Sequence, residues 1–372
     1  MTKLNDLYND YGQSPWIDNI RLDWVKDGTL ERLVSEGVRG VTSNPSIFAK
    51  TLSTSSAYDE LVVECGDIDP EMVFEKLAVN DVRLACDALS EVHKASVADF
   101  AAGVRRYADG FCSLEVSPRL ARDTVATVAA AKRLAGEVGR DNVMIKIPAT
   151  KEGLPAITEV LATGINVNIT LIFSLERYGE VITAWMEGLE TALAQRGHIN
   201  AIASVASFFV SRVDVAVDPL LPEDDPRRGT TANAQVAGAY ELYRRRMASD
   251  RARALLDAGA QVQRPLWAST STKNPSYFDL LYVDAIVADE TVNTMPDATL
   301  AATLDHGNFA TSTLLTDEGI RAAAAKLDEL PENVSLEQVT AKLEVDGVAA
   351  FSSAYDDLLV TVEKKMHDAP PT

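Results

Sequence analysis

The chain has few cysteines and few histidines, and those present are widely spaced. They form no Cys-x-x-Cys pair, no His-Glu-x-x-His motif and no triad signature. This excludes a disulfide framework, favours a reducing cytoplasm, and leaves no specific support for a zinc enzyme or a hydrolase. The residues concerned are Cys65, Cys86 and Cys112, and His93, His198, His306 and His367.

Positive charge and long apolar runs are also scarce. Lys and Arg number 35 against 55 Asp and Glu, which gives a net charge of −20. A field of that sign repels nucleic acids and anionic lipid surfaces, so neither is an expected partner. The longest uncharged run, Val160 to Leu175, is too short for a membrane span and contains Asn166, Asn168 and Thr170. The first ten residues lack the apolar segment of a signal peptide, so we expect a cytoplasmic protein.

What is present is an ordinary globular composition arranged as repeated strand and helix units. Hydrophobic residues make up 47% of the 372 residues and charged residues 24%. Short apolar or alternating runs recur between longer segments of helical period, the pattern of a parallel sheet. The eight candidate strands are Trp16–Ile20, Gly40–Ser43, Phe111–Val116, Val143–Pro148, Ile165–Phe173, Ala201–Val205, Leu266–Ser269 and Ala285–Ala288.

Eight strands alternating with helices favour the α/β class and a closed (β/α)₈ TIM barrel. An open doubly wound sheet would show much the same pattern. However, the sequence contains no Gly-x-Gly and no Gly-x-x-x-x-Gly-Lys, which weakens the dinucleotide and P-loop interpretations that accompany open sheets.

Helix boundaries are marked by capping residues. Caps are expected where Ser, Asp or Gly flanks a helical segment, with proline favoured at the first helical position. The expected boundaries are Asp69 before Pro70, Ser117 before Pro118, Gly139 after a helix, and a helix from Ser174 to Gly197. The stretch from Asp214 to Thr231 is rich in Asp, Pro and Arg and is predicted to be a long loop.

The chain after Thr316 differs from the rest, because it is helical without strands. Helices are expected near Asp317–Leu330, Ser335–Leu343 and Val348–His367. We therefore expect a barrel catalytic domain of residues 1–315 and a C-terminal helical extension of residues 316–372 packed on it.

Several predicted strands carry polar residues on one face only. Side chains alternate along a strand, so a polar set at every second position faces one side. If the apolar positions face the helices, the polar ones point into the barrel near its carboxyl end, where barrel enzymes hold their sites. The residues of this inferred face are Asp18, Asn44, Glu115, Lys146, Asn168 and Thr170.

A purely structural interpretation exists for each of these residues. Lys146 could be half of an ion pair with Glu115, Asn168 and Thr170 could bind backbone groups, and Asp18 could cap a helix. The coincidence of several polar residues on one inferred face favours a functional site, because a buried polar cluster is costly.

The residues also match a known family: the chain resembles transaldolases of the longer bacterial type with a C-terminal extension. The resemblance rests on GVTSNPSIF at 40–48, MIKIPAT at 144–150 and NVNITLIFS at 166–174, in that order. It covers about the whole chain and is weaker beyond Thr316. It implies a TIM barrel that needs no cofactor or metal. The implied reaction transfers a dihydroxyacetone unit from sedoheptulose 7-phosphate to glyceraldehyde 3-phosphate, giving erythrose 4-phosphate and fructose 6-phosphate.

The resemblance also implies a role for each site residue. By match to MIKIPAT, Lys146 is the Schiff-base lysine, and Asp18 and Glu115 are the acid/base pair. Thr170 is implied to hold a catalytic water, and Asn44 and Asn168 to bind substrate hydroxyls. The implied phosphate ligands are Ser207 and Arg212, with Lys273 as the substitute for an arginine of shorter transaldolases.

The implied mechanism is consistent with general chemistry. Cleaving a carbon–carbon bond next to a carbonyl leaves a carbanion, and without a metal the available electron sink is a protonated imine. Lys146 would supply the imine, Asp18 would accept the C4 hydroxyl proton, and Glu115 would shuttle protons through a water. Alternatives are a class I aldolase that releases free dihydroxyacetone, a zinc-dependent aldolase, and a non-catalytic sugar-phosphate-binding barrel.

Overall fold

The strands close on themselves. The structure is a computed structural model that describes residues 2–66 and 68–368. Its parallel strands pair in chain order from β1 to β8, and β8 pairs back with β1. The predicted (β/α)₈ barrel is therefore confirmed. The strands are β1 (Gln13–Asp18), β2 (Gly40–Thr42), β3 (Phe111–Glu115), β4 (Val143–Pro148), β5 (Asn166–Ile172), β6 (Ser204–Phe209), β7 (Gln263–Ala268) and β8 (Thr291–Met295).

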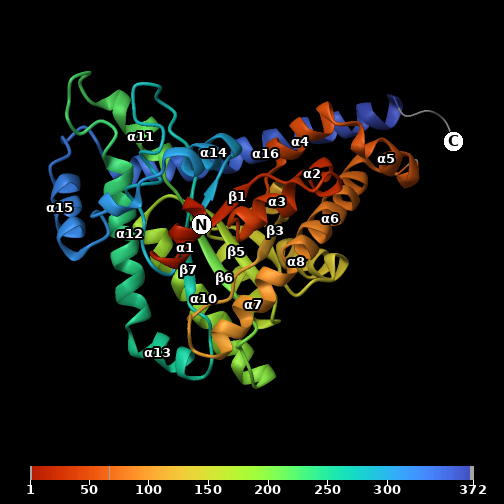
Figure 1. Cartoon of the computed structure of the whole chain (residues 1–372), viewed down its shortest axis with the longest axis horizontal. Helices are drawn as coiled ribbons and strands as arrows, with labels where there is room; N and C mark the ends of the chain where they lie inside the picture. The colour runs from red at the N-terminus through yellow and green to blue at the C-terminus, as the bar shows by residue number, and fades with distance from the viewer. Residues whose placement is uncertain (1, 67, 369–372) are drawn as a thin grey trace.

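Helices surround the barrel and extend beyond it (Figure 1). The shorter ones are α1 (Lys3–Asn9), α2 (Leu22–Lys26), α3 (Thr29–Glu36), α4 (Pro45–Thr54), α5 (Asp59–Cys65), α7 (Ser90–Ala101), α9 (Gly153–Ala162), α11 (Ser211–Val217), α13 (Asp250–Asp257), α14 (Asp297–His306) and α15 (Asp317–Asp328). The longer ones are α6 (Pro70–Ala88), α8 (Thr124–Val138), α10 (Leu175–Arg196), α12 (Thr231–Met247) and α16 (Leu336–Asp368). No helix of the described residues is long and apolar enough to cross a membrane.

Most of the expected helix boundaries are confirmed. Asp69 caps α6 by accepting from the Glu71 N–H, and Ser174 caps α10. Gly139 and Gly197 adopt left-handed conformations at the ends of α8 and α10.

One boundary is wrong. Ser117 makes no side-chain cap, and only the 3₁₀ turn Pro118–Leu120 follows it. Helix α8 begins later, where the Asp123 side chain accepts from the Ala126 N–H.

Two predicted strands are misplaced. The sixth strand lies at Ser204–Phe209, and the eighth lies beyond Ala285–Ala288, at Thr291–Met295. Residues 285–288 are a partly buried irregular segment outside the barrel strands. The apolar rule missed β8 because Asn293 and Thr294 within it are polar. Asn293 accepts from the Thr270 hydroxyl at 2.9 Å, and the Thr294 hydroxyl lies 2.7 Å from that of Thr42.

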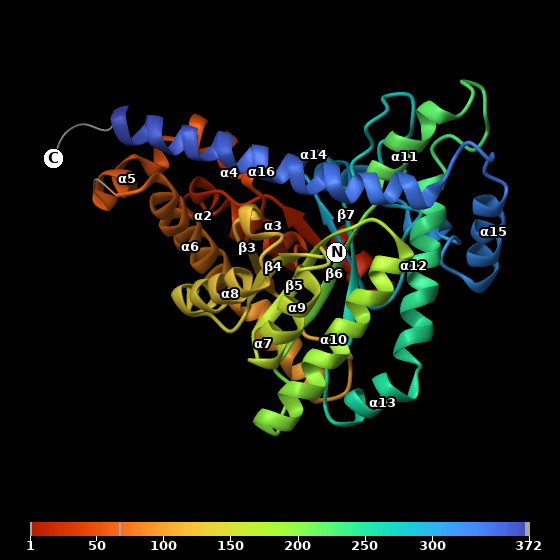
Figure 2. The same cartoon turned by 180° about the vertical axis from the view of Figure 1, so that it is seen from behind.

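The C-terminal region also differs from expectation. The two helices predicted at Ser335–Leu343 and Val348–His367 are one continuous helix, α16. Both views show α16 crossing one end of the barrel (Figures 1 and 2). The stretch predicted as a long loop from Asp214 begins inside α11, and its remainder leads to α12.

The barrel strands separate two apolar clusters. One lies inside the barrel and includes Trp16, Phe111, Met144 and Leu266, and the other is the larger core between strands and helices. The alternate positions Ile145 and Ile147 belong to that outer core. The predicted parity is therefore confirmed.

A network of buried charge closes the amino-terminal end of the barrel. The carboxylate of Asp109 is fully buried and accepts hydrogen bonds from Ser14, Trp16, Arg39 and Arg264 at 2.5 to 3.2 Å. Burial opposes ionisation, but the charges of Arg264 and Arg39 outweigh it and lower the pKa of Asp109. Every oxygen of this carboxylate is paired.

Candidate active site at the carboxyl end of the barrel

Lys146 and Glu115 lie side by side on neighbouring strands. The β3–β4 register places Glu115 opposite Lys146, and the β4–β5 register places Lys146 opposite Asn168. The Lys146 Nζ is 3.5 Å from the Glu115 Oε2, and both side chains are less than a tenth exposed. Three predicted site residues therefore converge across three adjacent strands.

The Glu115 carboxylate is poorly satisfied. Its Oε2 and the Thr170 hydroxyl are both buried, and neither has a hydrogen-bond partner among the described residues. Burial raises the pKa of Glu115 to about 7, and the Lys146 charge only partly offsets it. A carboxyl group with such a pKa can give or take a proton near neutral pH.

The Lys146 amine also contacts the end of β2. Its Nζ donates to the Ser43 carbonyl at 3.1 Å. The next residue, Asn44, caps α4, with its side-chain oxygen accepting from the Ile47 N–H at 3.1 Å. The cap fixes the Asn44 side chain at the barrel end and engages its carbonyl oxygen, so its amide NH₂ is the group available for a ligand.

Asp18 ends β1 on the same interior face. Its Oδ1 accepts from the Thr42 hydroxyl at 2.7 Å, and the Thr42 hydroxyl lies 2.7 Å from that of Thr294. Burial raises the pKa of Asp18, the Lys146 charge lowers it, and the nearby Asp297 raises it again. Asp18 therefore interacts electrostatically with Lys146 although the two are far apart in sequence.

Asn168 joins two serines inside the barrel. Its amide donates to the Ser113 hydroxyl at 3.0 Å, and its oxygen accepts from the Ser207 hydroxyl at 2.7 Å. Both Asn168 and Ser207 are buried. The structure thus brings these two predicted residues together, with Ser207 bonded to Asn168.

The two predicted cations lie at the exposed barrel mouth. Arg212 is the second residue of α11, and Lys273 follows β7 and donates to the Ser271 hydroxyl at 2.5 Å. Desolvation and the Arg212 charge lower the pKa of Lys273, whereas Asp18 raises it. Lys273 therefore lies close enough to Arg212 and to Asp18 to interact electrostatically with both.

Some residues of this region were not predicted. The hydroxyls of Ser211 and Ser269 lie 3.0 Å apart beside Arg212, and Ser269 has a left-handed φ of 56°. Phe351, from α16, places its ring centroid 5.7 Å from the Lys146 Nζ. The STSTKN segment contains Ser269, but no sequence pattern links Phe351 to the lysine.

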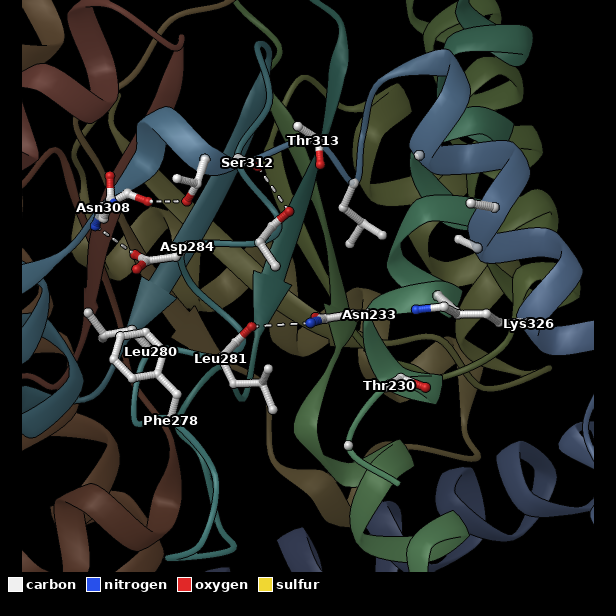
Figure 3. A pocket seen from close by; sticks show the side chains of 18 of the residues that line it. Thr230, Asn233, Phe278, Leu280, Leu281, Asp284, Asn308, Ser312, Thr313 and Lys326 are labelled. Carbon is white, nitrogen blue, oxygen red and sulfur yellow. Dashed lines mark hydrogen bonds between the residues drawn. The ribbon is translucent and has the colours of Figure 1, made fainter. Parts of the chain in front are cut away.

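A cavity lies on the flank of the barrel, away from these residues. It has a volume of about 810 Å³ and lies between α12, α15 and the segment before β8 (Figure 3). Within it, Asn233 donates to the Leu281 carbonyl at 3.1 Å. None of the predicted site residues lines this cavity. Among the described residues, no group of three or more His, Cys, Asp or Glu is arranged to hold a metal ion.

The Lys146–Glu115 ion pair lies inside an α/β barrel, at the end of the strands where enzymes of this fold class hold their active sites. A family model described as transaldolase/fructose-6-phosphate aldolase matches residues 15–362. The chain therefore belongs to this family.

Similar proteins agree with the family assignment. Transaldolase 1 of Streptomyces coelicolor is 45% identical over 366 residues, covering 96% of this chain and 93% of its own. Transaldolase 1 of Streptomyces avermitilis is 46% identical over 363 residues, covering 95% and 93%. The transaldolase of Saccharopolyspora erythraea is 44% identical over 375 residues, covering 98% of both chains. The predicted family is confirmed, and these findings support an enzyme of the transferase class with transaldolase activity.

Proposed function

We propose that this protein transfers a dihydroxyacetone unit from sedoheptulose 7-phosphate to glyceraldehyde 3-phosphate, giving erythrose 4-phosphate and fructose 6-phosphate. The observation that carries the proposal is the buried Lys146 amine 3.5 Å from the Glu115 carboxylate inside the closed barrel. The names of the similar proteins support the same activity.

The first step is imine formation on Lys146. The neutral amine attacks the ketone carbon, and the hydroxyl of the resulting carbinolamine leaves as water. The proposed proton carrier is Glu115, through a water that the Thr170 hydroxyl helps to hold. Both the Glu115 Oε2 and the Thr170 hydroxyl are buried and free to bind such a water. A pKa of about 7 suits Glu115 to both directions of proton transfer.

The second step is cleavage between C3 and C4. Asp18 would take the proton of the C4 hydroxyl, and the bonding electrons would move into the imine to form an enamine. The hydroxyl of Thr42 holds the Asp18 carboxylate by a 2.7 Å hydrogen bond. The aldose leaves, and an acceptor aldose then undergoes the reverse sequence.

The remaining residues would bind substrate. Asn44 would offer its amide, and Asn168 would contact the three-carbon unit from the floor of the site. Ser207 donates its one hydroxyl hydrogen to Asn168, so its proposed part in phosphate binding requires the hydroxyl to turn from Asn168 to the phosphate. Arg212 and Lys273 would hold the phosphate at the barrel mouth, against the overall charge of −20.

We also propose the division into a barrel domain of residues 1–315 and a helical extension of residues 316–372. Residues 1, 67 and 369–372 of these ranges lie outside the described residues. Small sugar phosphates are the proposed partners. The three cysteines are free thiols in the structure, which fits the proposed cytoplasmic location.

The function is tested by an acceptor-dependent assay. With fructose 6-phosphate as donor, steady formation of glyceraldehyde 3-phosphate should require added erythrose 4-phosphate. An equimolar amount of sedoheptulose 7-phosphate should appear with it. Fast release of dihydroxyacetone without acceptor would indicate an aldolase instead. Loss of activity with a chelator would indicate zinc chemistry, and binding without turnover would indicate a sugar-phosphate-binding barrel.

A further inference from the structure

We propose that Phe351, on α16, is a specificity-determining residue that covers the Lys146 imine and favours transfer of the three-carbon unit over its release to water. The proposal rests on the transaldolase function proposed above. It assigns to the C-terminal helix a direct part in the outcome of the reaction.

Helix α16 is held in place over the barrel end. It contacts α4, α6, α11 and the end of β5, and both views show it crossing the barrel (Figures 1 and 2). Ion pairs tie it to the barrel along its length, so the position of Phe351 is fixed from both sides. These pairs are Glu344 with Arg177 at 3.3 Å, Asp356 with Arg119 at 2.6 Å, and Lys365 with Asp59 at 2.6 Å.

A glycine brings α16 close to β5. Gly347 lies one turn before Phe351, so the two residues share a helix face. A Cβ at Gly347 would lie 3.2 Å from Leu171 and 3.4 Å from the Phe173 ring. A larger side chain at this position would require Leu171 or Phe173 to shift, so the glycine lets α16 pack closely on β5.

The ring of Phe351 faces the lysine nitrogen. Its centroid is 5.7 Å from the Nζ, within the range at which an aromatic face attracts a cation. The polar partners of the same nitrogen, the Ser43 carbonyl and the Glu115 carboxylate, belong to the barrel. Phe351 is half-buried, and its ring is the apolar group that α16 presents to this nitrogen.

The enamine on Lys146 has two fates. In transfer, its carbon attacks the aldehyde carbon of the acceptor, the aldehyde oxygen takes a proton, and the imine reforms. Water then adds to the imine carbon, and the C–N bond breaks to free the ketose product and the amine. In release, the same carbon takes a proton, water adds to the imine carbon, and the C–N bond breaks to free dihydroxyacetone and the amine. Both fates consume one water at the imine carbon, but only release needs a proton delivered to the enamine carbon. An apolar ring beside the nitrogen limits the water that would deliver this proton.

The test compares product partition in three variants. For wild type, Phe351→Ala, Phe351→Leu and the control Val345→Ala, the ratio of released dihydroxyacetone to sedoheptulose 7-phosphate is measured with fructose 6-phosphate and limiting erythrose 4-phosphate. Val345 is on the same helix and 56% exposed. We expect the ratio to rise roughly three- to tenfold in Phe351→Ala, less in Phe351→Leu, and not in the control.

Borohydride trapping separates this proposal from the function itself. Each variant should still form a reduced three-carbon adduct on Lys146, and thermal unfolding should confirm that each is folded. Unchanged partition in both Phe351 variants would overturn the proposal, as would a folded Phe351→Leu protein that forms no adduct. Failure of the wild type to transfer or to form an adduct would instead contradict the proposed function.

Discussion

At the amino-terminal end of the barrel, the Asp109 carboxylate receives four hydrogen bonds, two of them from arginines, and its pKa is lowered. At the carboxyl end, the Glu115 carboxylate has one lysine 3.5 Å away, an oxygen without a hydrogen-bond partner among the described residues, and a pKa raised to about 7. Both carboxylates are buried in the same barrel.

The comparison distinguishes a buried carboxylate that supports the fold from one that is available for chemistry. A fully paired carboxylate stays ionised and fixes its neighbours, and breaking such a pair is strongly destabilising. An incompletely paired one costs stability but can exchange protons and accept a water or a substrate group. We infer that the amino-terminal network holds the barrel together and that the carboxyl-end group performs the chemistry.

The largest expected effect is on catalysis at the carboxyl end. Asp18→Ala removes the proposed acceptor of the C4 hydroxyl proton but leaves Lys146 and Glu115 in place. Turnover should fall on the order of 10²- to 10⁴-fold. Imine formation should continue, so borohydride should trap a six-carbon adduct on Lys146 with fructose 6-phosphate. A three-carbon adduct formed at the wild-type rate would show that another group performs the cleavage.

Removing the paired carboxylate should affect stability instead. Asp109→Ala leaves Arg264 buried without its counter-charge, so the free energy of unfolding in urea should fall by about 3–5 kcal/mol. The fraction that remains folded should keep the wild-type turnover number. The comparison between the two ends breaks down if Asp109→Ala is stable but inactive.

Glu115 should give a smaller, pH-dependent effect on stability. Its pKa is raised from 4.5 to about 7 in the folded protein. The folded state therefore holds the proton more tightly, and the free energy of unfolding should fall as pH rises from about 4.5 to about 7. At 1.36 kcal/mol per pKa unit the loss is roughly 3 kcal/mol.

Glu115→Gln should remove this part of the pH dependence, and the exposed Glu60→Gln is the matched control. Comparing each variant with wild type isolates Glu115, since burial also raises the pKa of Asp81 and Asp214. Urea titrations at several pH values measure the free energy of unfolding of each variant. Equal pH profiles for Glu115→Gln and wild type would show that the pKa of Glu115 is not raised in the folded protein.

The smallest expected effect is at the barrel mouth. Arg212→Ala should raise KM for fructose 6-phosphate by about tenfold or more and leave KM for unphosphorylated fructose nearly unchanged, because the guanidinium would bind only the phosphate. Arg253→Ala, also exposed, serves as the control. Equal losses on both substrates would indicate damage to the fold instead of a lost phosphate contact.

The site residues at the carboxyl end of the barrel could be predicted from the sequence, whereas the charge network at the amino-terminal end could not. Strand parity placed Glu115, Lys146 and Asn168 on one face because alternation along a strand is a local property. The Asp109 network was not predicted, because Asp109 lies outside every predicted strand and its partners come from distant parts of the chain.

The remaining errors have a similar origin. β8 was misplaced because Asn293 and Thr294 are polar, and their partners on β2 and after β7 are visible only in the closed barrel. α16 was divided between Leu343 and Val348, in a segment that contains Gly347, because glycine often ends a helix and the close packing of Gly347 on Leu171 is a tertiary contact. Phe351 was missed for the same reason.

The most direct test of the account is the position of the covalent adduct. The wild-type protein is incubated with fructose 6-phosphate, reduced with borohydride, digested, and mapped by peptide mass, with Lys151→Ala as a matched control for a nearby exposed lysine. We predict a three-carbon addition on the peptide containing Lys146, present in Lys151→Ala and absent in Lys146→Ala. An adduct on any other lysine, or none in an enzyme that still transfers, would contradict the assignment.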